Sequence, residues 1–546
     1  MRGGNKAGSL GIAAFLSALV LLGGWGALLL ARSRGPAPPL PPYELPAFAP
    51  DEPLPPPPPP GLPRPQVLRY NNSSEPQTLD PARMVGLPDI TVALGLFEGL
   101  TSLHPRTLRP VPGMAESWEL SPDGLVYRFR LRPALWSDGS PLSAHDFVHA
   151  WQRVLRPETG AAYATLFKPV RSFEAFDERT LEVRLRVPVP YFLELAAFAT
   201  FAPVHRGCLE AHGTRWTRPG NLVSNGPFVL AEWRPYERIV LRKNPRYWDT
   251  SRVALDEIQV LAITDTETAL KKYLTGEVDW IREVPGHKIA EAARVPGFRY
   301  SPQLNTYFFR FNVGRWPLND VRVRKALSLA VDKAGIARYL LRAGQRPARS
   351  FVPPILPGYS PVEGPDYDPA EARRLLARAG FPRGSGFPSL TLLYNSSESH
   401  QQIAEAIQHM WRTQLGINIA LFNQEWGVYQ SSMRNRDYDI ARSSWVGDYA
   451  DPSTFLDCFQ SDGGNNRTGW RSRRYDELLA MAAREPHPAW RMTLYQEAER
   501  ILVCDEMPIL PLYFYVNAYL VHPRVQGVFD NWRNFHPFQY IHLAGD

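Results

Sequence analysis

The sequence predicts a mixed α/β protein with two or three domains. Polar and apolar residues alternate at 126–131 (VYRFRL) and 180–187 (TLEVRLRV), which is the period of a half-buried strand. Apolar residues recur at spacings of three and four at 323–339 and 401–414, which is the period of a helix. The chain has 546 residues, enough for several domains, and shows no repeat of fixed period that would indicate a solenoid or propeller.

Turn motifs separate these periodic segments. Pro-Asp-Gly at 122–124, Ser-Asp-Gly at 137–139 and Asn-Gly-Pro at 225–227 each interrupt an apolar run. Asp and Asn side chains bond nearby backbone in turns, and Gly tolerates a left-handed backbone. We therefore interpret all three motifs as structural turns and not as catalytic sequences.

The N-terminal segment predicts export. Between Lys6 and Arg32 lie 25 residues without a charge, which as a helix span about 37 Å, more than a bilayer core. This is longer than the apolar part of a signal peptide, so residues 1–34 are predicted to be a retained membrane anchor, with cleavage as a signal peptide as the alternative. The rest is then periplasmic or otherwise extracytoplasmic, tethered to the inner membrane, or soluble after cleavage.

A proline-rich linker follows at 35–66. It contains the unbroken run Pro55–Pro60, and such sequences adopt an extended polyproline II conformation without a packed core. The 31 residues of 35–65 could span about 90 Å at roughly 3.1 Å per residue. We predict that this segment is a spacer.

Charge and cysteine content exclude several classes of protein. The formal charge of +7 is spread along the chain, so no nucleic-acid partner is predicted. Cys208, Cys458 and Cys504 have no zinc-like spacing and cannot form a disulfide framework. Either all three are thiols or one pair forms, and Cys458 with Cys504 is the pair that we consider.

Motifs of common enzyme classes do not occur in the sequence. It contains no GxxxxGK[ST] phosphate loop, no GxSxG elbow and no HExxH zinc helix. We predict that the protein is not an enzyme and carries no cofactor or metal.

The segment 437–455 (DYDIARSSWVGDYADPSTF) has the residues that a peptide ligand requires. A buried peptide needs an acidic partner for its ammonium, a basic partner for its carboxylate and an exposed strand edge. Arg442 and Asp448 supply the charges, and Trp445 and Tyr449 can pack along an extended chain. From these residues alone, a structural salt bridge between Arg442 and Asp448 explains the pattern equally well.

The segment resembles the bacterial oligopeptide-binding proteins, which form the extracellular solute-binding protein family 5 of ABC transporters. The resemblance covers the chain from about residue 67 to its end. It is carried by the segment above and by TLDPARMVGLPD, LFEGL, LSPDGLVYRFRLRPALWSDGSPLSAHDFVHAWQRVLRPETGAAYA, SNGPFVLAEWRPYERIVLRKNPRYW, LNDVRVRKALSLAVDK, NQEWGVY and LPLYFYVNAYLV.

The resemblance implies an α/β, periplasmic binding protein-like fold with two lobes around a hinge and an additional inserted domain. The implied divisions are a first lobe from 67–97, 222–304 and 515–546, an inserted domain at 98–221, and a second lobe at 305–514. It also implies capture of short peptides in the interlobe cleft and their delivery by a monomer to an ABC transporter permease. A non-peptide or modified ligand in the same fold, and an anchored peptide receptor without transport, are the alternatives.

The resemblance also implies which residues bind the ligand. Asp448 would pair with the α-amine, and Arg442 and His400 with a carboxylate. The remaining implied contacts are the backbone around Ser444, Trp445 and Val446 and, from the first lobe, Gly86 and Leu87.

Several positions depart from the family pattern. Met433 stands where the family often has a second arginine, for which the adjacent Arg434 could substitute. Asn305 and Val446 stand at the positions of two cysteines that are paired in the best-known relatives. Val85 and Arg310 stand at the positions of two acidic residues that line side-chain pockets. We therefore expect a weaker preference for basic side chains.

Overall fold

The computed structural model describes residues 52–84 and 86–545. The predicted anchor at 1–34, the linker up to residue 51, and Val85 lie outside the described residues. Among the helices in the described ranges, none combines the length and the apolar character needed to cross a bilayer.

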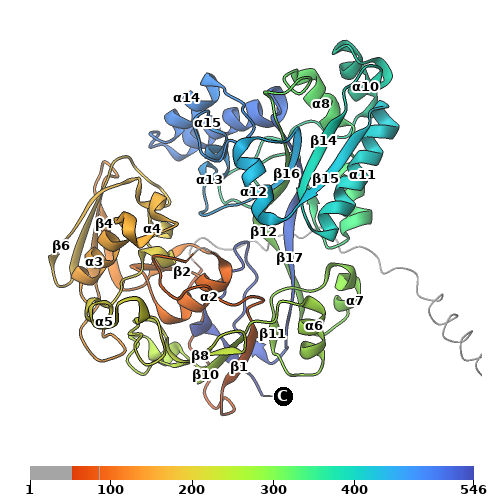
Figure 1. The fold of residues 1–546 in the computed structure, drawn as a ribbon. Helices are drawn as coiled ribbons and strands as arrows, with labels where there is room; N and C mark the ends of the chain where they lie inside the picture. Colours follow the sequence, from red (N-terminus) through yellow and green to blue (C-terminus); the bar gives the residue numbers. More distant parts are fainter. Residues whose placement is uncertain (1–51, 85, 546) are drawn as a thin grey trace, which may run out of the picture.

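One large mixed sheet of eleven strands forms the frame (Figure 1). Its strand order is β15-β14-β16-β12-β17-β11-β1-β10-β9-β8, with β13 beside β17. The strands are β1 (Val67–Asn71), β8 (Phe228–Arg234), β9 (Arg238–Lys243), β10 (Glu257–Leu261), β11 (Trp280–Ile281), β12 (Phe298–Phe311), β13 (Arg346–Pro347), β14 (Leu390–Asn395), β15 (Ile419–Gln424), β16 (Ile440–Val446) and β17 (Ile509–Val521). We call the part around β1 and β8–β11 the first lobe, and the part around β14–β16 the second lobe.

The long antiparallel strands β12 and β17 connect the two lobes (Figure 1). At one end β17 pairs with β11 of the first lobe, and β12 pairs with β16 of the second. Their register shifts between Pro302 and Thr306, where Thr306 lies opposite Phe514. Such an irregularity bends and twists a strand pair. The boundaries predicted at 304/305 and 514/515 lie at this shift, and the domain limits stay predictions.

Apolar alternation along β12 builds the core of the second lobe. Tyr307 and Phe309 pack with Trp411 in one cluster, and Phe308 packs with Phe351 in another. Because neighbouring side chains point to opposite faces of a strand, both faces of the sheet must be covered. The covering helices are α8 (Val321–Leu329), α10 (Pro369–Arg378) and α11 (Glu398–Leu415) with the first cluster, and α13 (Ser453–Leu456), α14 (Arg473–Ala482) and α15 (Pro488–Arg500) with the second.

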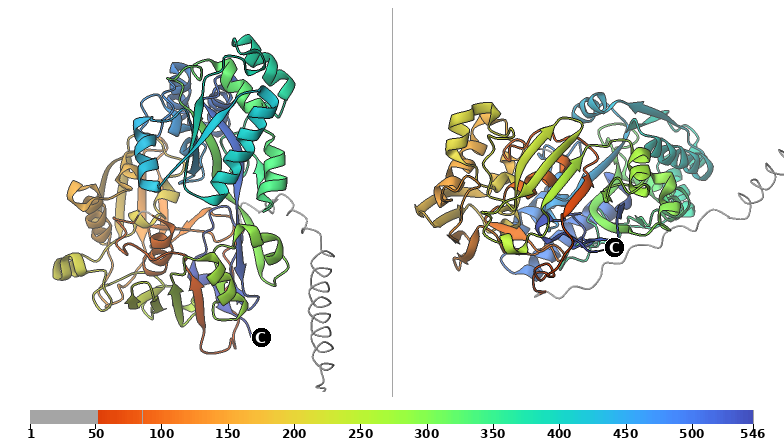
Figure 2. Two further views of the ribbon diagram at one scale, coloured as in Figure 1. Left: turned by 45° about the vertical axis from the view of Figure 1, so that its right-hand side comes forward. Right: turned by 90° about the horizontal axis from the view of Figure 1, so that it is seen from below.

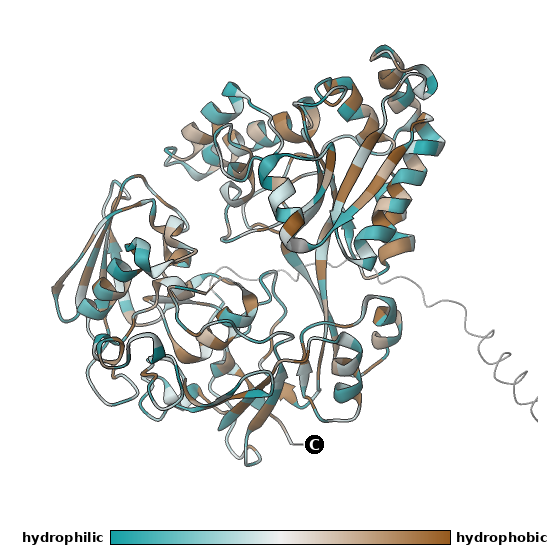
Figure 3. Cartoon of the chain, in the orientation of Figure 1, coloured by the Kyte–Doolittle hydropathy of each residue, from teal (hydrophilic) through white to brown (hydrophobic). Residues whose placement is uncertain are grey.

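The hydropathy of the residues agrees with this packing of helices on the sheet. The strands of the second lobe are largely hydrophobic, whereas the outer sides of its helices are hydrophilic (Figure 3). In the first lobe, α2 (Leu87–Leu96), α6 (Thr266–Leu274) and α7 (Ile289–Ala292) lie around the sheet (Figure 1). The two lobes are joined by β12 and β17 and by the apolar cluster around Phe308, which also includes Leu103 of the inserted domain and Trp532 of the C-terminal segment.

The inserted domain lies to one side of both lobes (Figures 1 and 2). Its sheet has the order β4-β5-β7-β6, and the strands predicted at 126–131 and 180–187 are β5 (Val126–Leu131) and β7 (Thr180–Leu185). Its other elements include β2 (Thr101–Leu103), β3 (Pro110–Pro112), β4 (Ala115–Leu120), α3 (Ala144–Leu155), β6 (Val170–Asp177), α4 (Phe192–Leu195) and α5 (Arg206–His212).

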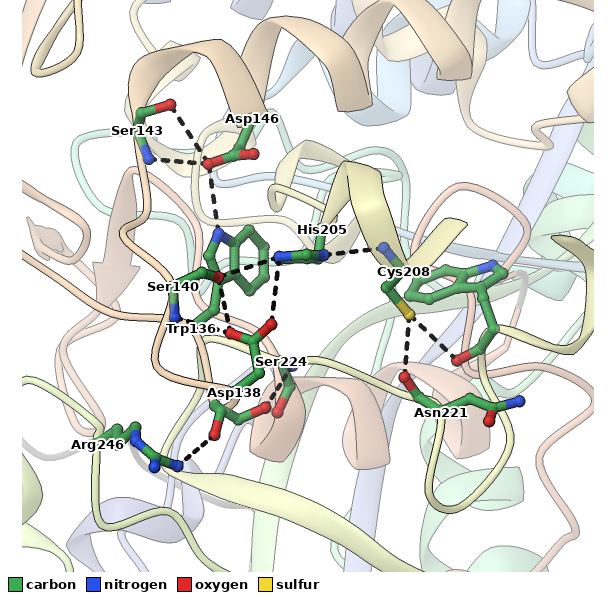
Figure 4. Close-up of polar contacts among 12 residues, drawn as sticks. Trp136, Asp138, Ser140, Ser143, Asp146, His205, Cys208, Asn221, Ser224 and Arg246 are labelled. Atoms are coloured by element: carbon green, nitrogen blue, oxygen red, sulfur yellow. Dashed lines mark hydrogen bonds and ion pairs between the residues drawn. The ribbon is translucent and has the colours of Figure 1, made fainter. Parts of the chain in front are cut away.

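The predicted turn at 137–139 is held by a polar cluster in this domain (Figure 4). Asp138 accepts hydrogen bonds from the backbone and hydroxyl of Ser140, at 2.9 and 2.7 Å. His205 lies 3.1 Å from the Ser140 hydroxyl and accepts a bond from the backbone N–H of Cys208 at 2.9 Å. These groups satisfy one another, which supports the structural interpretation of this turn.

Two sequence predictions need correction. The helix predicted at 323–339 is broken: α8 ends at Leu329, and Asp332 caps a new helical segment by accepting from the N–H of Gly335 at 2.8 Å. The considered pair of Cys458 and Cys504 is wrong, because all three cysteines are free. Cys208 and Cys458 are buried, and Cys504 is partly exposed.

The second half of the predicted spacer lies against the folded protein. Arg109 donates to the carbonyl of Glu52 at 2.6 Å, and the imidazole of His104 lies 3.0 Å from the carbonyl oxygen of Pro53. Residues 55–59 line a hollow together with Tyr540. The predicted reach of about 90 Å is therefore wrong, since these prolines are held by the protein and do not extend away from it.

Candidate functional site in the interlobe cleft

Strand β16 has an edge without a strand partner next to the hinge. Its pairing with β14 covers only Ile440 and Ala441, whereas its other edge pairs with β12 as far as Val446. Within the described ranges, no strand pairs with Arg442–Val446 on the β14 side. The carbonyl of Arg442 accepts from the hydroxyl of Tyr429, and the remaining groups of this edge can accept an extended peptide as an added strand. The segment contains the predicted Ser444 and Trp445, both partly exposed, and Val446, which is 59% exposed.

Arg442 places a buried cation at one end of this edge. Its side chain is 7% exposed, donates to Tyr515 Oη at 2.8 Å and to Asn395 Oδ1 at 3.2 Å, and lies over the ring of Tyr307 at 4.7 Å. Its Nε has no hydrogen-bond partner in the described part of the chain. No carboxylate lies within 4.0 Å of Arg442 among residues 52–84 and 86–545, although buried cations are normally paired. The guanidinium can therefore receive a ligand carboxylate.

His400 lies beside this cation, in the first turn of α11. Its Nδ1 is 3.5 Å from the hydroxyl of Tyr307, which the guanidinium of Arg442 overlies. Burial, together with the positive charge of Arg442, lowers the pKa of His400 to about 3. His400 is thus neutral near pH 7, so it can contribute a hydrogen bond but no charge.

Asp448 supplies the opposite charge just beyond the end of β16. Its backbone N–H donates to Thr454 Oγ1 at 2.9 Å, and its carbonyl accepts from Arg533 at 3.0 Å, which fixes the loop. Burial raises the pKa of the Asp448 carboxyl, and the positive charge of Arg533 partly opposes this. In the described structure this carboxyl has no ion pair or hydrogen bond, so the structural salt bridge with Arg442 is excluded there.

The two predicted aromatic residues are both engaged by the protein. Trp445 donates its Nε1–H to the carbonyl of Thr454 at 2.6 Å. Tyr449 stacks on Tyr191 of the inserted domain, with ring centroids 3.8 Å apart and an angle of 7°. One face of the Tyr449 ring is therefore covered, which leaves it less surface for a ligand than the sequence predicted.

In the first lobe, Gly86 and Leu87 form the beginning of α2 and not a strand edge. Gly86 is the extended residue before the helix, and its carbonyl accepts from the N–H groups of Asp89 and Ile90 at 3.1 Å. Leu87 is 55% exposed and lines a cavity of this lobe. Gly86 can therefore offer a ligand little more than its N–H.

The departures from the family pattern have visible consequences. Met433 is 2% exposed in an apolar cluster. Arg434 is exposed on the last turn of α12 (Trp426–Asn435) and has no ion pair within the described residues. Val446 lies opposite Asn305 across β12 and β16. Arg310 is 4% exposed and donates to Ser443 Oγ at 3.1 Å and to the carbonyl of Asn465 at 2.9 Å.

Other residues of the site were not predicted from the sequence. Tyr307 and Tyr515 hold Arg442 from β12 and β17, and no local signal indicates this role. Arg533 and Glu194 lie 3.7 Å apart, and Glu194 accepts from the N–H of Ala450 at 2.9 Å. These contacts join three distant parts of the chain around the Asp448 loop.

The chain is similar to a known family over most of its length. Residues 109–467 match the group described as bacterial extracellular solute-binding proteins, family 5 Middle. The periplasmic oligopeptide-binding protein OppA of Salmonella typhimurium is 38% identical over 490 residues, which are 85% of this chain and 89% of that protein. The periplasmic murein peptide-binding protein MppA of Escherichia coli is 37% identical, over 85% of this chain and 90% of that protein.

Solved structures agree with this similarity. The unliganded open form of the murein tripeptide-binding protein MppA has a TM-score of 0.76 and 36% identity, and covers 88% of this chain and 98% of its own. Haemophilus influenzae OppA in complex with RPPGFSPFR has a TM-score of 0.75 and 31% identity, and covers 89% of this chain and 100% of its own. The predicted α/β, periplasmic binding protein-like fold with two lobes and an inserted domain is confirmed.

Proposed function

Since the chain belongs to the bacterial extracellular solute-binding proteins of family 5, we propose that it captures short peptides in the interlobe cleft and delivers them to the permease of an ABC importer. The observation that carries this proposal is the pair of Arg442 and Asp448. Each lacks an oppositely charged partner on its side chain in the described structure, and the free edge of β16 lies between them. An extended peptide brings the three groups that this arrangement lacks: a carboxylate, an ammonium and a backbone edge.

The positions of the two charges also fix the direction of the ligand. Arg442 lies within β16, and Asp448 follows the C-terminal end of the strand. A peptide whose carboxylate meets Arg442 and whose amine meets Asp448 runs antiparallel to β16. Binding involves no chemical change in the ligand, and closure of the lobes excludes water from both charge pairs.

Titration calorimetry with the intact protein tests this function. Free Ala-Ala-Ala is expected to bind at least about 100-fold more tightly than the same peptide acetylated and amidated at its ends, because the capped peptide leaves both buried charges unpaired. Equal affinities would contradict the proposal. Mass spectrometry of copurified ligand then separates peptides from the alternative of a non-peptide or modified ligand.

We also propose that the folded part works outside the cytoplasm as a monomer tethered through residues 1–34. The docked residues 52–59 support a defined starting point for this tether on the body of the protein. Fractionation of cells that produce the full chain is expected to leave the protein in the membrane fraction after a high-salt wash. Recovery of a soluble form that begins after the apolar segment would establish cleavage instead.

A further inference from the structure

The first lobe contains a cavity next to the Asp448 end of the cleft. Its volume is about 100 Å³, which is room for a side chain but less than the roughly 300–1,000 Å³ of pockets that enclose a whole ligand. Its walls come from β1 at Tyr70, from α2, from the inserted domain at Leu103 and around Phe198, from the end of β11 with Arg282, and from the segment 533–536. Segments that are distant in sequence therefore converge on one hollow.

The wall of this cavity carries a positive charge without an ion pair at Arg282. The guanidinium is half-buried and donates to Thr91 Oγ1 at 3.4 Å, and no carboxylate of the described residues lies within 4.0 Å of it. The exposed Glu283 acts on this charge from a greater distance. Glu194 is the one acid among the lining residues, and it already lies 3.7 Å from Arg533 and accepts from the Ala450 N–H. The charge of Arg282 is therefore available to an anion.

Two further polar groups in this wall lack partners. Trp280 is 3% exposed, and its Nε1 has no hydrogen-bond partner in the described residues. His536 shares a hydrogen bond of 2.7 Å with Asn534 Oδ1 through Nε2, and its Nδ1 has no partner there either. Burial, with the nearby charge of Arg282, lowers the pKa of His536 to about 3, so this imidazole is neutral. Unsatisfied buried polar groups are costly and mark a place where a ligand can bond.

The rest of the wall is apolar and determines the shape of the group that fits. The apolar lining side chains include Leu87, Ile90, Leu94, Leu103 and Phe535. An inorganic anion would leave these side chains without a contact. An acidic side chain, with one or two methylenes below its carboxylate, can contact the apolar wall and Arg282 together.

We propose that this cavity binds the acidic side chain of a residue at the amino end of the peptide. The inference rests on the proposed function. Arg533 lines the cavity and also donates to the Asp448 carbonyl at 3.0 Å, so the cavity adjoins the place assigned to the ligand amine. Leu87, which lines the cavity and is 55% exposed, is one of the two first-lobe residues, with Gly86, that the resemblance assigns to the ligand. The protein thereby selects peptides that begin with Glu or Asp.

Calorimetry with three tripeptides and two variants tests this selectivity. Wild-type protein is expected to bind Glu-Ala-Ala at least about tenfold more tightly than Gln-Ala-Ala, because only the former brings a charge to Arg282. In Arg282→Gln the two affinities are expected to agree within about twofold, with Ala-Ala-Ala binding as in wild type. Arg206→Gln, an exposed arginine of α5 paired with Glu210, serves as the matched control and keeps the preference. Thermal unfolding checks that both variants are folded.

The outcomes separate this inference from the function on which it rests. Binding of Ala-Ala-Ala without a preference for Glu, or a preference that survives Arg282→Gln, would overturn the inference alone. Failure of every free tripeptide to bind wild-type protein would overturn the proposed function and the inference with it.

Discussion

Arg442→Ala is expected to weaken the binding of Ala-Ala-Ala by at least about 100-fold. The variant leaves the ligand carboxylate buried without a cation, and truncation of one partner of a desolvated charge pair costs about 2–5 kcal/mol. It also removes the donor to Tyr515 and Asn395, so two polar side chains lose their bond. Arg442→Lys is expected to lie between wild type and alanine, since an ammonium keeps the charge but not the two parallel bonds.

A thermodynamic cycle that combines Arg442→Ala with a peptide amide isolates the contact between Arg442 and the ligand carboxylate. Ala-Ala-Ala-amide is expected to bind wild-type protein weakly and to lose little more in Arg442→Ala, because the group that Arg442 would hold is already missing. Arg473→Ala, an exposed residue of α14 that pairs with Glu477, provides the control and should bind as wild type. Equal losses for the acid and the amide would show that Arg442 has only a structural role.

Much of the secondary structure could be predicted from the sequence, because the periodic patterns of strands and helices depend on residues that are close together in the chain. The alternation in β5 and the helical spacing within α11 each depend on a few neighbouring residues, and both elements were predicted. The prediction of one helix at 323–339 was wrong because Asp332 caps a new helical segment and so competes with continuation of the first helix. The docking of the proline segment depends on Arg109 and His104, side chains far from it in sequence.

The site was predictable only where it lies within one segment. Arg442 and Asp448 are six residues apart, so the charges could be found, but the sequence allowed them to pair with each other. The structure separates these interpretations, because Arg442 donates to the hydroxyl of Tyr515 while Asp448 belongs to the loop held by Arg533. The cavity at Arg282 joins segments distant in the chain, and no spacing in the sequence indicates it.

Asp448→Asn is expected to weaken tripeptide binding at about pH 7.5 by roughly 30-fold or more, because the ligand ammonium loses its only assigned anion. The same residue should make wild-type affinity depend on pH. Burial raises the pKa of Asp448 above that of a free aspartate, so lowering the pH protonates this carboxyl while the ligand amine stays charged.

The ionised form of Asp448 binds the amine, so affinity should be full near neutral pH and fall as the pH drops through the raised pKa. In Asp448→Asn this fall is expected to disappear, because no group titrates opposite the amine. Calorimetry of Ala-Ala-Ala at a series of pH values, repeated in buffers of different ionisation enthalpy, measures both the affinity and the proton taken up or released. A variant that keeps the wild-type pH profile would place the amine away from Asp448. If the variant is folded and loses the pH dependence, the amino end of the peptide binds at Asp448.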